Sequence, residues 1–278
     1  MLRGGSTRCR FVGGSAAVSF VFDLPLWIVG LLLVIVMCGL AAAGLRFARR
    51  RVLPRFEFTE GDGHFTSTIV HSIMVFYALA VAMISISAWE THDAAAKIVS
   101  QEATALATLY RDIGAYPQST RARLQAELRE YAEYVIEEAW PEQHQGRVPL
   151  GGVARINRFQ TILTSFEPTT EGEKIYHAET MRSYNRLIDA RRMRLDAIQT
   201  ALPGLMWTVI YVGAALAVVG SYFFRVRDPR LHMTLVMLLT TFFALVIFVV
   251  LAFDRPFRGD MGIESEPYEL VYDQLMKR

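Results

Sequence analysis

The feature that most constrains this chain is a long stretch, residues 64–112, that contains neither glycine nor proline. Gly63 precedes it and Gly114 follows soon after it. Its first half, residues 65–89, is apolar enough to cross a bilayer, whereas its second half carries charged side chains: Glu90, Asp93, Lys97, Glu102 and Arg111. Because a helix rises ~1.5 Å per residue and a hydrocarbon core is ~30 Å thick, one unbroken helix would project far beyond the membrane. We therefore predict a single rod shared by a membrane part and an aqueous part.

Composition indicates an integral membrane protein, since 53% of the residues are hydrophobic and the polar residues are gathered into blocks. Apolar runs long enough to span a bilayer occur at residues 24–45, 65–89, 205–224 and 231–253. We predict an all-α fold with transmembrane helices 1 and 2 within residues 24–89 and transmembrane helices 3 and 4 within residues 204–253. Four crossings would place both termini on the same side of the membrane.

The polar block between these pairs, residues 90–203, is predicted to form a helical-bundle extramembrane domain. Apolar side chains recur there at helical spacing, as in the run Leu124, Leu128, Tyr131 and Val135. Thr170 followed by Glu173 has the spacing of a capping box, so we expect a further helix to begin there. The remaining segments are an N-terminal tail, residues 1–23, and a C-terminal tail, residues 254–278.

The short loops within each pair of spans are rich in arginine: Arg46, Arg49, Arg50, Arg51 and Arg55 in the first, and Arg225, Arg227 and Arg230 in the second. Short loops of this kind generally remain in the cytoplasm. The arginine pattern therefore predicts that the helical domain lies on the outer side of the membrane.

The second span has a polar and small-residue face, on which His64, Ser67, His71, Ala78, Ala82 and Ser85 fall roughly in line. Small residues allow helices to approach closely in a membrane, and ionisable residues there usually face a partner or a cavity. One interpretation is ordinary packing inside a four-helix bundle, with His71 hydrogen-bonded to a neighbour. The other is that copies of this helix surround a pore, which these residues line and which the alanines constrict.

No signature of catalysis or of a bound cofactor is present in the sequence. We find no phosphate-binding loop, dinucleotide fingerprint, HExxH or nucleophile elbow, so we expect no enzyme activity and no cofactor. The six histidines are scattered, and the two cysteines lack metal-ligand spacing, so no metal site is expected. A net charge of only +2 gives no general electrostatic case for nucleic acid.

A motif directly after the fourth span combines opposite charges with a proline and a glycine: Asp254, Arg255, Pro256, Phe257, Arg258 and Gly259. Pro256 would end the helix, and the charged side chains can satisfy freed backbone groups or lock against a neighbouring subunit. We interpret Asp254, Arg255, Pro256, Phe257 and Gly259 as a structural clamp.

Several segments resemble the bestrophin-like domain family of bacterial membrane proteins. They are Trp89-Glu90 with Asp93, Glu102-Ala103, Leu109-Tyr110-Arg111, Glu137-Glu138-Ala139-Trp140-Pro141, Asp189-Ala190-Arg191-Arg192 and the motif from Asp254 to Gly259. The family is similar in turn to the bestrophins, which are pentameric chloride channels with four membrane segments and a long second segment that lines the pore. The resemblance implies a multi-pass protein of the bacterial inner membrane, a homopentamer, and an anion as the permeant ion. It also implies a cytosolic domain, opposite to the side that the arginines predict.

We therefore expect a homo-oligomeric, channel-like membrane protein that gives small ions a pathway along transmembrane helix 2. The alternative is a non-conducting sensor or scaffold, anchored in the bilayer, whose helical domain binds a ligand or partner. Ion flux through the purified protein in liposomes separates the two hypotheses.

Overall fold

The computed structural model describes residues 25–55, 62–224 and 226–277, and every regular element within these ranges is helical. The expected N-terminal tail, residues 1–23, and Arg225 lie outside the described residues. The structure has four helices long and apolar enough to cross a membrane. The predicted all-α fold with four spans is thus confirmed.

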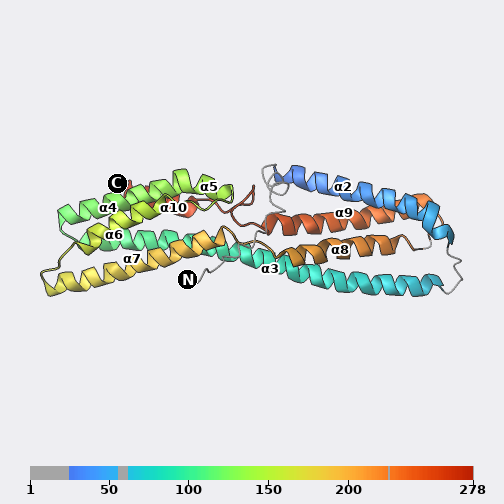
Figure 1. The fold of residues 1–278 in the computed structure, drawn as a ribbon, viewed down its shortest axis with the longest axis horizontal. Helices are drawn as coiled ribbons and strands as arrows, with labels where there is room; N and C mark the ends of the chain where they lie inside the picture. The colour runs from blue at the N-terminus through green and yellow to red at the C-terminus, as the bar shows by residue number, and fades with distance from the viewer. Residues whose placement is uncertain (1–24, 56–61, 225, 278) are drawn as a thin grey trace, which may run out of the picture.

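One helix runs the whole length of the molecule and belongs to both of its halves (Figure 1). This helix, α3, extends from Asp62 to Asp112 over 51 residues. At ~1.5 Å per residue it is roughly 76 Å long, more than twice the thickness of a hydrocarbon core. The long second helix that the glycine- and proline-free stretch predicted is therefore confirmed. A short 3-10 turn, Ile113–Ala115, ends it.

The membrane half consists of the first part of α3 together with α2 (Leu26–Phe47), α8 (Gly204–Ser221) and α9 (Pro229–Phe253). A π turn, Ala48–Val52, and a 3-10 turn, Leu53–Arg55, continue α2 at the end of the molecule far from the domain. Close contacts depend on small residues, since the ring of Phe248 lies over Gly30 and that of Tyr222 over Gly44. The Tyr222 hydroxyl also donates to the carbonyl oxygen of Ala41 at 3.1 Å. These contacts hold α2 against α8 and α9.

The second half of α3 forms a domain with α4 (Gln118–Tyr134), α5 (Trp140–His144), α6 (Gly152–Thr164) and α7 (Glu171–Ala197). A π turn, Val135–Ala139, joins α4 to α5. The predicted apolar face is buried: Leu124, Leu128, Tyr131 and Val135. The predicted capping box is also present, because Thr170 Oγ1 accepts from the Glu173 amide and the Glu173 carboxylate accepts from the Thr170 amide, both at 3.1 Å.

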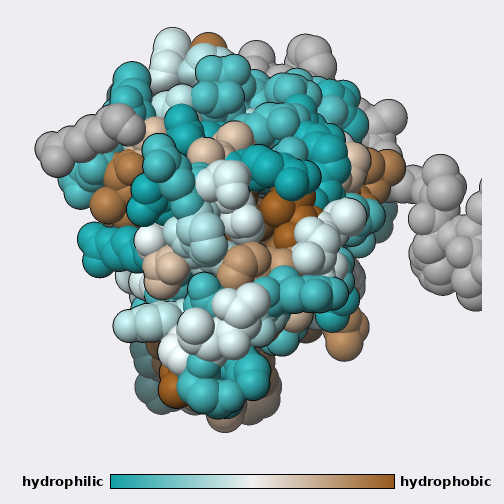
Figure 2. Space-filling view, turned by 90° about the vertical axis from the view of Figure 1, so that its left-hand side faces the viewer, coloured by the Kyte–Doolittle hydropathy of each residue, from teal (hydrophilic) through white to brown (hydrophobic). Residues whose placement is uncertain are grey.

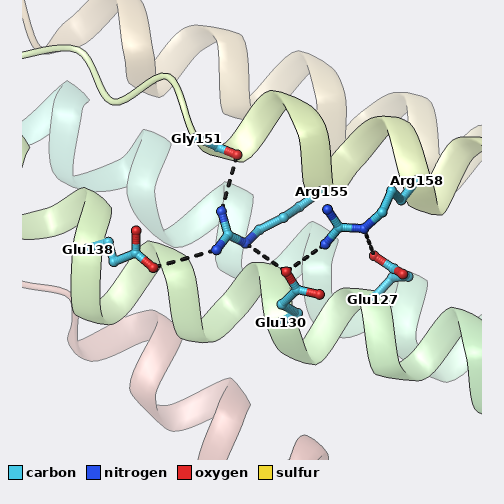
Figure 3. Close-up of polar contacts among 6 residues, drawn as sticks. All are labelled: Glu127, Glu130, Glu138, Gly151, Arg155 and Arg158. Atoms are coloured by element: carbon cyan, nitrogen blue, oxygen red, sulfur yellow. Dashed lines mark hydrogen bonds and ion pairs between the residues drawn. The ribbon is translucent and has the colours of Figure 1, made fainter.

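Ion pairs on the surface of the domain join α4 to α6 (Figure 3). Arg158 donates to Glu127 at 3.0 Å and to Glu130 at 2.6 Å, and Arg155 lies 3.2 Å from Glu130. Figure 2 views the molecule from the domain end and shows a mostly hydrophilic surface. The domain is therefore suited to water, in contrast to the apolar surface of the membrane half.

The chain after α9 continues beyond the membrane half and packs into the domain (Figure 1). It forms α10 (Glu266–Val271) and a π turn, Tyr272–Met276. Tyr268 and Met276 are almost fully buried in the core of the domain. The Tyr272 hydroxyl donates to the carboxylate of Glu133 on α4. The last residues of the chain thus stabilise the part of α3 that lies outside the membrane.

Candidate functional site along helix α3

A narrow buried stripe fixes the rotation of α3 in the membrane half. Tyr77, in the middle of this stripe, donates from its hydroxyl to the Ile210 carbonyl oxygen at 3.0 Å. Its ring lies against Gly213, where an added Cβ would be only 2.2 Å from Cδ2, and packs edge-on against Phe243 with 5.3 Å between centroids. Val70, Val81 and Ala88 continue the stripe. The other sides of α3 are left to face lipid, water or another subunit.

The predicted small and polar face lies on one of these uncovered sides. His71 follows the buried Val70 by one residue, so it lies ~100° further round the helix axis. The structure places the six predicted residues as follows: His64, His71, Ala78 and Ala82 are exposed, and Ser67 and Ser85 are half-buried. Among the described residues, no other helix of the chain seals this face. The intramolecular packing that we considered as an alternative is therefore absent for the exposed members.

The hydroxyl groups on this face donate to their own helix. Ser67 donates to the His64 carbonyl oxygen at 2.8 Å, and Ser85 donates to the Val81 carbonyl oxygen at 2.8 Å. Their hydroxyl protons are therefore satisfied, while lone pairs on each oxygen can still accept from water. A serine bonded in this way makes the helix surface polar. It is not an activated nucleophile, because its hydroxyl donates to a backbone carbonyl oxygen and not to a neighbouring base.

A shallow hollow of about 480 Å³ lies along the first turns of α3. Ser67 and His71 line it together with Thr68, Ser72, Met74 and, from the end of α8, Phe224. The hollow thus brings together two of the six predicted residues, whereas Ala78, Ala82 and Ser85 lie further along the helix. Phe224 was not predicted, because the four-span topology brings the end of α8 near the start of α3 without indicating which side chain there contacts it.

A second uncovered strip of α3 carries large apolar side chains that the sequence analysis did not consider. It includes Phe65, Phe76, Leu79, Met83 and Ile86, all of them exposed. Bulky apolar side chains are compatible with lipid, whereas an ionisable histidine is costly there. The two strips therefore differ in the surroundings that they suit.

The predicted clamp lies where the membrane half meets the domain. Asp254 caps the end of α9 and accepts from the Leu202 amide at 2.8 Å, immediately before α8 begins. Burial raises the pKa of Asp254, against the smaller lowering effects of that amide and of Arg255. Phe257 is buried and packs against Trp140 with 6.2 Å between ring centroids. These contacts connect α9 both to α8 and to the domain.

The other clamp residues shape the turn that follows α9. Pro256 is buried, and its carbonyl oxygen accepts from the Ile263 amide at 2.9 Å. Gly259 has a φ of 73°, a conformation that glycine adopts without the steric cost of a Cβ. Arg255 lies 3.9 Å from Asp254, and Arg258 donates to the Gln145 carbonyl oxygen at 3.0 Å.

A buried ion pair in the domain links the second half of α3 to α7. Arg194 Nε lies 2.6 Å from Glu102 Oε2, and the two side chains are 2% and 0% exposed. Tyr131 donates to Glu102 at 2.7 Å, and Arg194 also donates to Gln143 at 2.7 Å. Burial is the largest single effect and would lower the pKa of Arg194, but the Glu102 carboxylate together with Tyr268 and Tyr131 outweighs it and raises the pKa well above the ordinary value.

This pair was not predicted as such from the sequence, which placed Glu102 on the rod without naming its partner. The signal was present, since Glu102 falls within the apolar stripe of Val99, Ala103 and Leu106. A carboxylate in such a stripe needs a buried cation. Among the described residues, no cluster of three or more His, Cys, Asp or Glu side chains is arranged to hold a metal ion.

Comparisons with known proteins agree with this architecture. A family model described as Bestrophin-like domain matches residues 35–268. A search of curated proteins found no significant match. A crystal structure of a mutated bacterial bestrophin homologue from Klebsiella pneumoniae is similar with a TM-score of 0.56 and 14% identity, covering 90% of this chain and 99% of that one. A second crystal structure, of a variant described only as a membrane protein, has a TM-score of 0.57 and 12% identity, covering 90% and 98%.

Proposed function

Because the chain belongs to the bestrophin-like family, we propose that it assembles into a homo-oligomer and conducts small ions along α3. A pentamer and an anion such as chloride are the assembly and the permeant species that the family implies. The membrane is the bacterial inner membrane, which the chain crosses four times.

The observation that carries this proposal is the uncovered polar and small-residue face of α3. His64 and His71 are exposed on a helix whose other uncovered strip is apolar. An imidazole is costly in hydrocarbon, so this face is better suited to a neighbouring subunit or a water-filled axis. An oligomer built around α3 provides both.

The alanines supply a narrow part of the proposed pathway. Ala78 and Ala82 lie one helical turn apart, on the same face as His71 and towards the domain. Small apolar side chains that surround an axis form a constriction that can gate by dewetting. Bulk added at this level obstructs the pathway without touching the buried stripe that holds α3.

Flux through the purified protein in liposomes tests the proposal. We expect Ala78→Phe to abolish most of the flux and His71→Ala to change its rate. Ala43→Phe is the matched control, because Ala43 is also exposed but lies on α2. The proposal fails if intact oligomers of the unmodified protein carry no flux, or if Ala78→Phe and Ala43→Phe conduct equally well.

Orientation is a separate part of the proposal. Arg49, Arg50 and Arg51 follow α2, and Arg227 and Arg230 lie where α9 begins, at the end of the bundle opposite the domain (Figure 1). Following the arginines, this end faces the cytoplasm and the domain lies outside. In a background with Cys9→Ser and Cys38→Ser, a membrane-impermeant thiol reagent on intact cells should then label Arg123→Cys on the exposed surface of α4 and leave Arg50→Cys unmodified. The reverse pattern would place the domain in the cytosol, as the family implies.

A groove in the domain favours the second candidate function, a non-conducting sensor or scaffold. It has a volume of about 640 Å³ between α3 and α7, and Lys97, Gln101, Arg186 and Asp189 are among its lining residues. A polar ligand or a partner segment fits such a lining. This candidate replaces the channel if oligomers carry no flux while Arg186→Ala removes a ligand that wild-type protein retains.

A further inference from the structure

The end of the bundle far from the domain carries a strong positive charge. Arginines gather there on the last turn of α2, on the turns that follow it and where α9 begins: Arg46, Arg49, Arg50, Arg51, Arg55, Arg227 and Arg230. The 22 residues of α2 rise roughly 33 Å, about the thickness of a hydrocarbon core, so the turns after it lie at the membrane surface. These arginines are therefore at the depth of lipid headgroups.

Arg49 differs from the rest because it is half-buried and built into the structure. Its Nη2 donates to the Val226 carbonyl oxygen at 3.0 Å and lies 3.2 Å from His232 Nδ1. Among the described residues, no carboxylate lies within ion-pair distance of it. Half-buried charges of this kind are costly unless something of opposite charge neutralises them.

His232 does not neutralise Arg49, but it holds the guanidinium in place. A guanidinium only donates hydrogen bonds, so Nδ1 of His232 must accept from Arg49. Nε2 is then the protonated nitrogen and donates to the Ser221 carbonyl oxygen at 3.0 Å. His232 is thus the neutral tautomer, and being only 2% exposed it is fixed between α8 and α9. The positive charge of Arg49 stays in a set position, and within the described parts of the chain only Nη2 of its guanidinium makes a hydrogen bond.

Beside Arg49 lies a hollow of about 210 Å³ with one charged wall and several apolar ones. Leu53, Phe223 and Phe224 supply apolar surface, and Gly63 at the start of α3 supplies a surface without a side chain. A ligand that suits this lining has an anionic head and an apolar body. A free inorganic anion would match only Arg49.

We infer that this hollow binds an anionic glycerophospholipid, with the phosphodiester opposite Arg49. The planar fork of an arginine matches phosphate oxygens, and the start of an acyl chain can lie along Leu53 and Phe224. The surrounding arginines add a long-range preference for acidic over zwitterionic lipid. The inference does not depend on whether the protein conducts ions.

Native mass spectrometry of the purified full chain, titrated with phosphatidylglycerol or phosphatidylcholine, tests the site. We expect phosphatidylglycerol to bind at least about tenfold more tightly, and Arg49→Gln to remove that preference, since charge-assisted phosphate contacts are strong. Gly63→Leu is the second variant, because a Cβ at Gly63 meets no atom within 4 Å. Because Gly63 lines the hollow, leucine at this position adds bulk to its wall without changing charge. Gly39→Leu on α2, where a Cβ also meets nothing within 4 Å, is its matched control.

Loss of phosphatidylglycerol binding in both Arg49→Gln and Gly63→Leu, with Gly39→Leu unaffected, supports the inference. Equal binding of the two lipids by the wild-type chain overturns it, and so does unchanged binding in Gly63→Leu. Displacement of the lipid by millimolar inorganic phosphate would assign the site to a free anion and would overturn the lipid as its occupant.

Discussion

Removing Arg194 should destabilise the domain more than removing any surface arginine. In Arg194→Met the Glu102 carboxylate keeps the Tyr131 hydroxyl at 2.7 Å but loses its cation, while both positions stay buried. Removing one partner of a buried ion pair typically costs about 3–5 kcal/mol, because the remaining charge cannot reach water. For a chain of this size, that loss lowers the unfolding midpoint by roughly 10 °C.

Thermal unfolding followed by far-ultraviolet circular dichroism in detergent measures this effect. Arg158→Met is the matched control. Like Arg194, Arg158 forms ion pairs with glutamate, in its case with Glu127 and Glu130, but it is exposed on the surface of the domain (Figure 3). Its midpoint should stay close to that of the wild type, since exposed ion pairs contribute little. Adding Glu102→Leu to Arg194→Met should recover part of the loss by removing the unpaired charge. Equal midpoints for Arg194→Met and Arg158→Met would refute this reasoning.

Two further predictions concern the contacts that position the spans. Gly213→Ala should cost about 1–3 kcal/mol and alter flux, because the new Cβ would displace the ring of Tyr77, whereas Gly39→Ala should be harmless to both. Unfolding and flux assays on the same preparations check this, and a flux unchanged by Gly213→Ala would contradict it. Asp254→Ala should cost about 1–3 kcal/mol by leaving the Leu202 amide unpaired, whereas Asp254→Asn keeps an acceptor there. Burial raises the pKa of Asp254 in the folded protein, so folding is stabilised by the protonated carboxyl group. This stabilisation is fully present at pH values below the ordinary carboxyl range, and it is lost as the pH rises through the raised pKa. The difference in unfolding midpoint between the wild type and Asp254→Asn should therefore fall as the pH rises. A difference that grows with pH would contradict the raised pKa.

Much of the architecture could be predicted because it depends on local and periodic signals. The absence of glycine and proline between Gly63 and Gly114 was enough to predict α3 as one helix. Thr170 and Glu173 marked the start of α7 through a short-range hydrogen-bond pattern. The apolar spacing of Leu124 and Leu128 identified a buried face in the same way.

What the sequence did not indicate were contacts between residues far apart in the chain. The pairing of Glu102 with Arg194 joins helices whose relative rotation depends on the whole domain core. The return of Tyr268 into that core follows an irregular segment that carries no periodic pattern. The uncovered face of α3 was predicted as a polar line. This face is exposed within the chain because the Tyr77 ring packs against Gly213 and so sets the rotation of α3. The spacing of residues along the sequence does not determine that contact.

Cysteine accessibility along α3 tests the central claim most directly. In a background with Cys9→Ser and Cys38→Ser, single cysteines at Ala78 and Phe76 are treated with a charged, water-soluble thiol reagent in liposomes. If α3 lines the pathway with its small face, Ala78→Cys reacts and its flux is blocked, whereas Phe76→Cys on the apolar strip is protected. Reaction at Phe76→Cys with no reaction at Ala78→Cys would contradict the account.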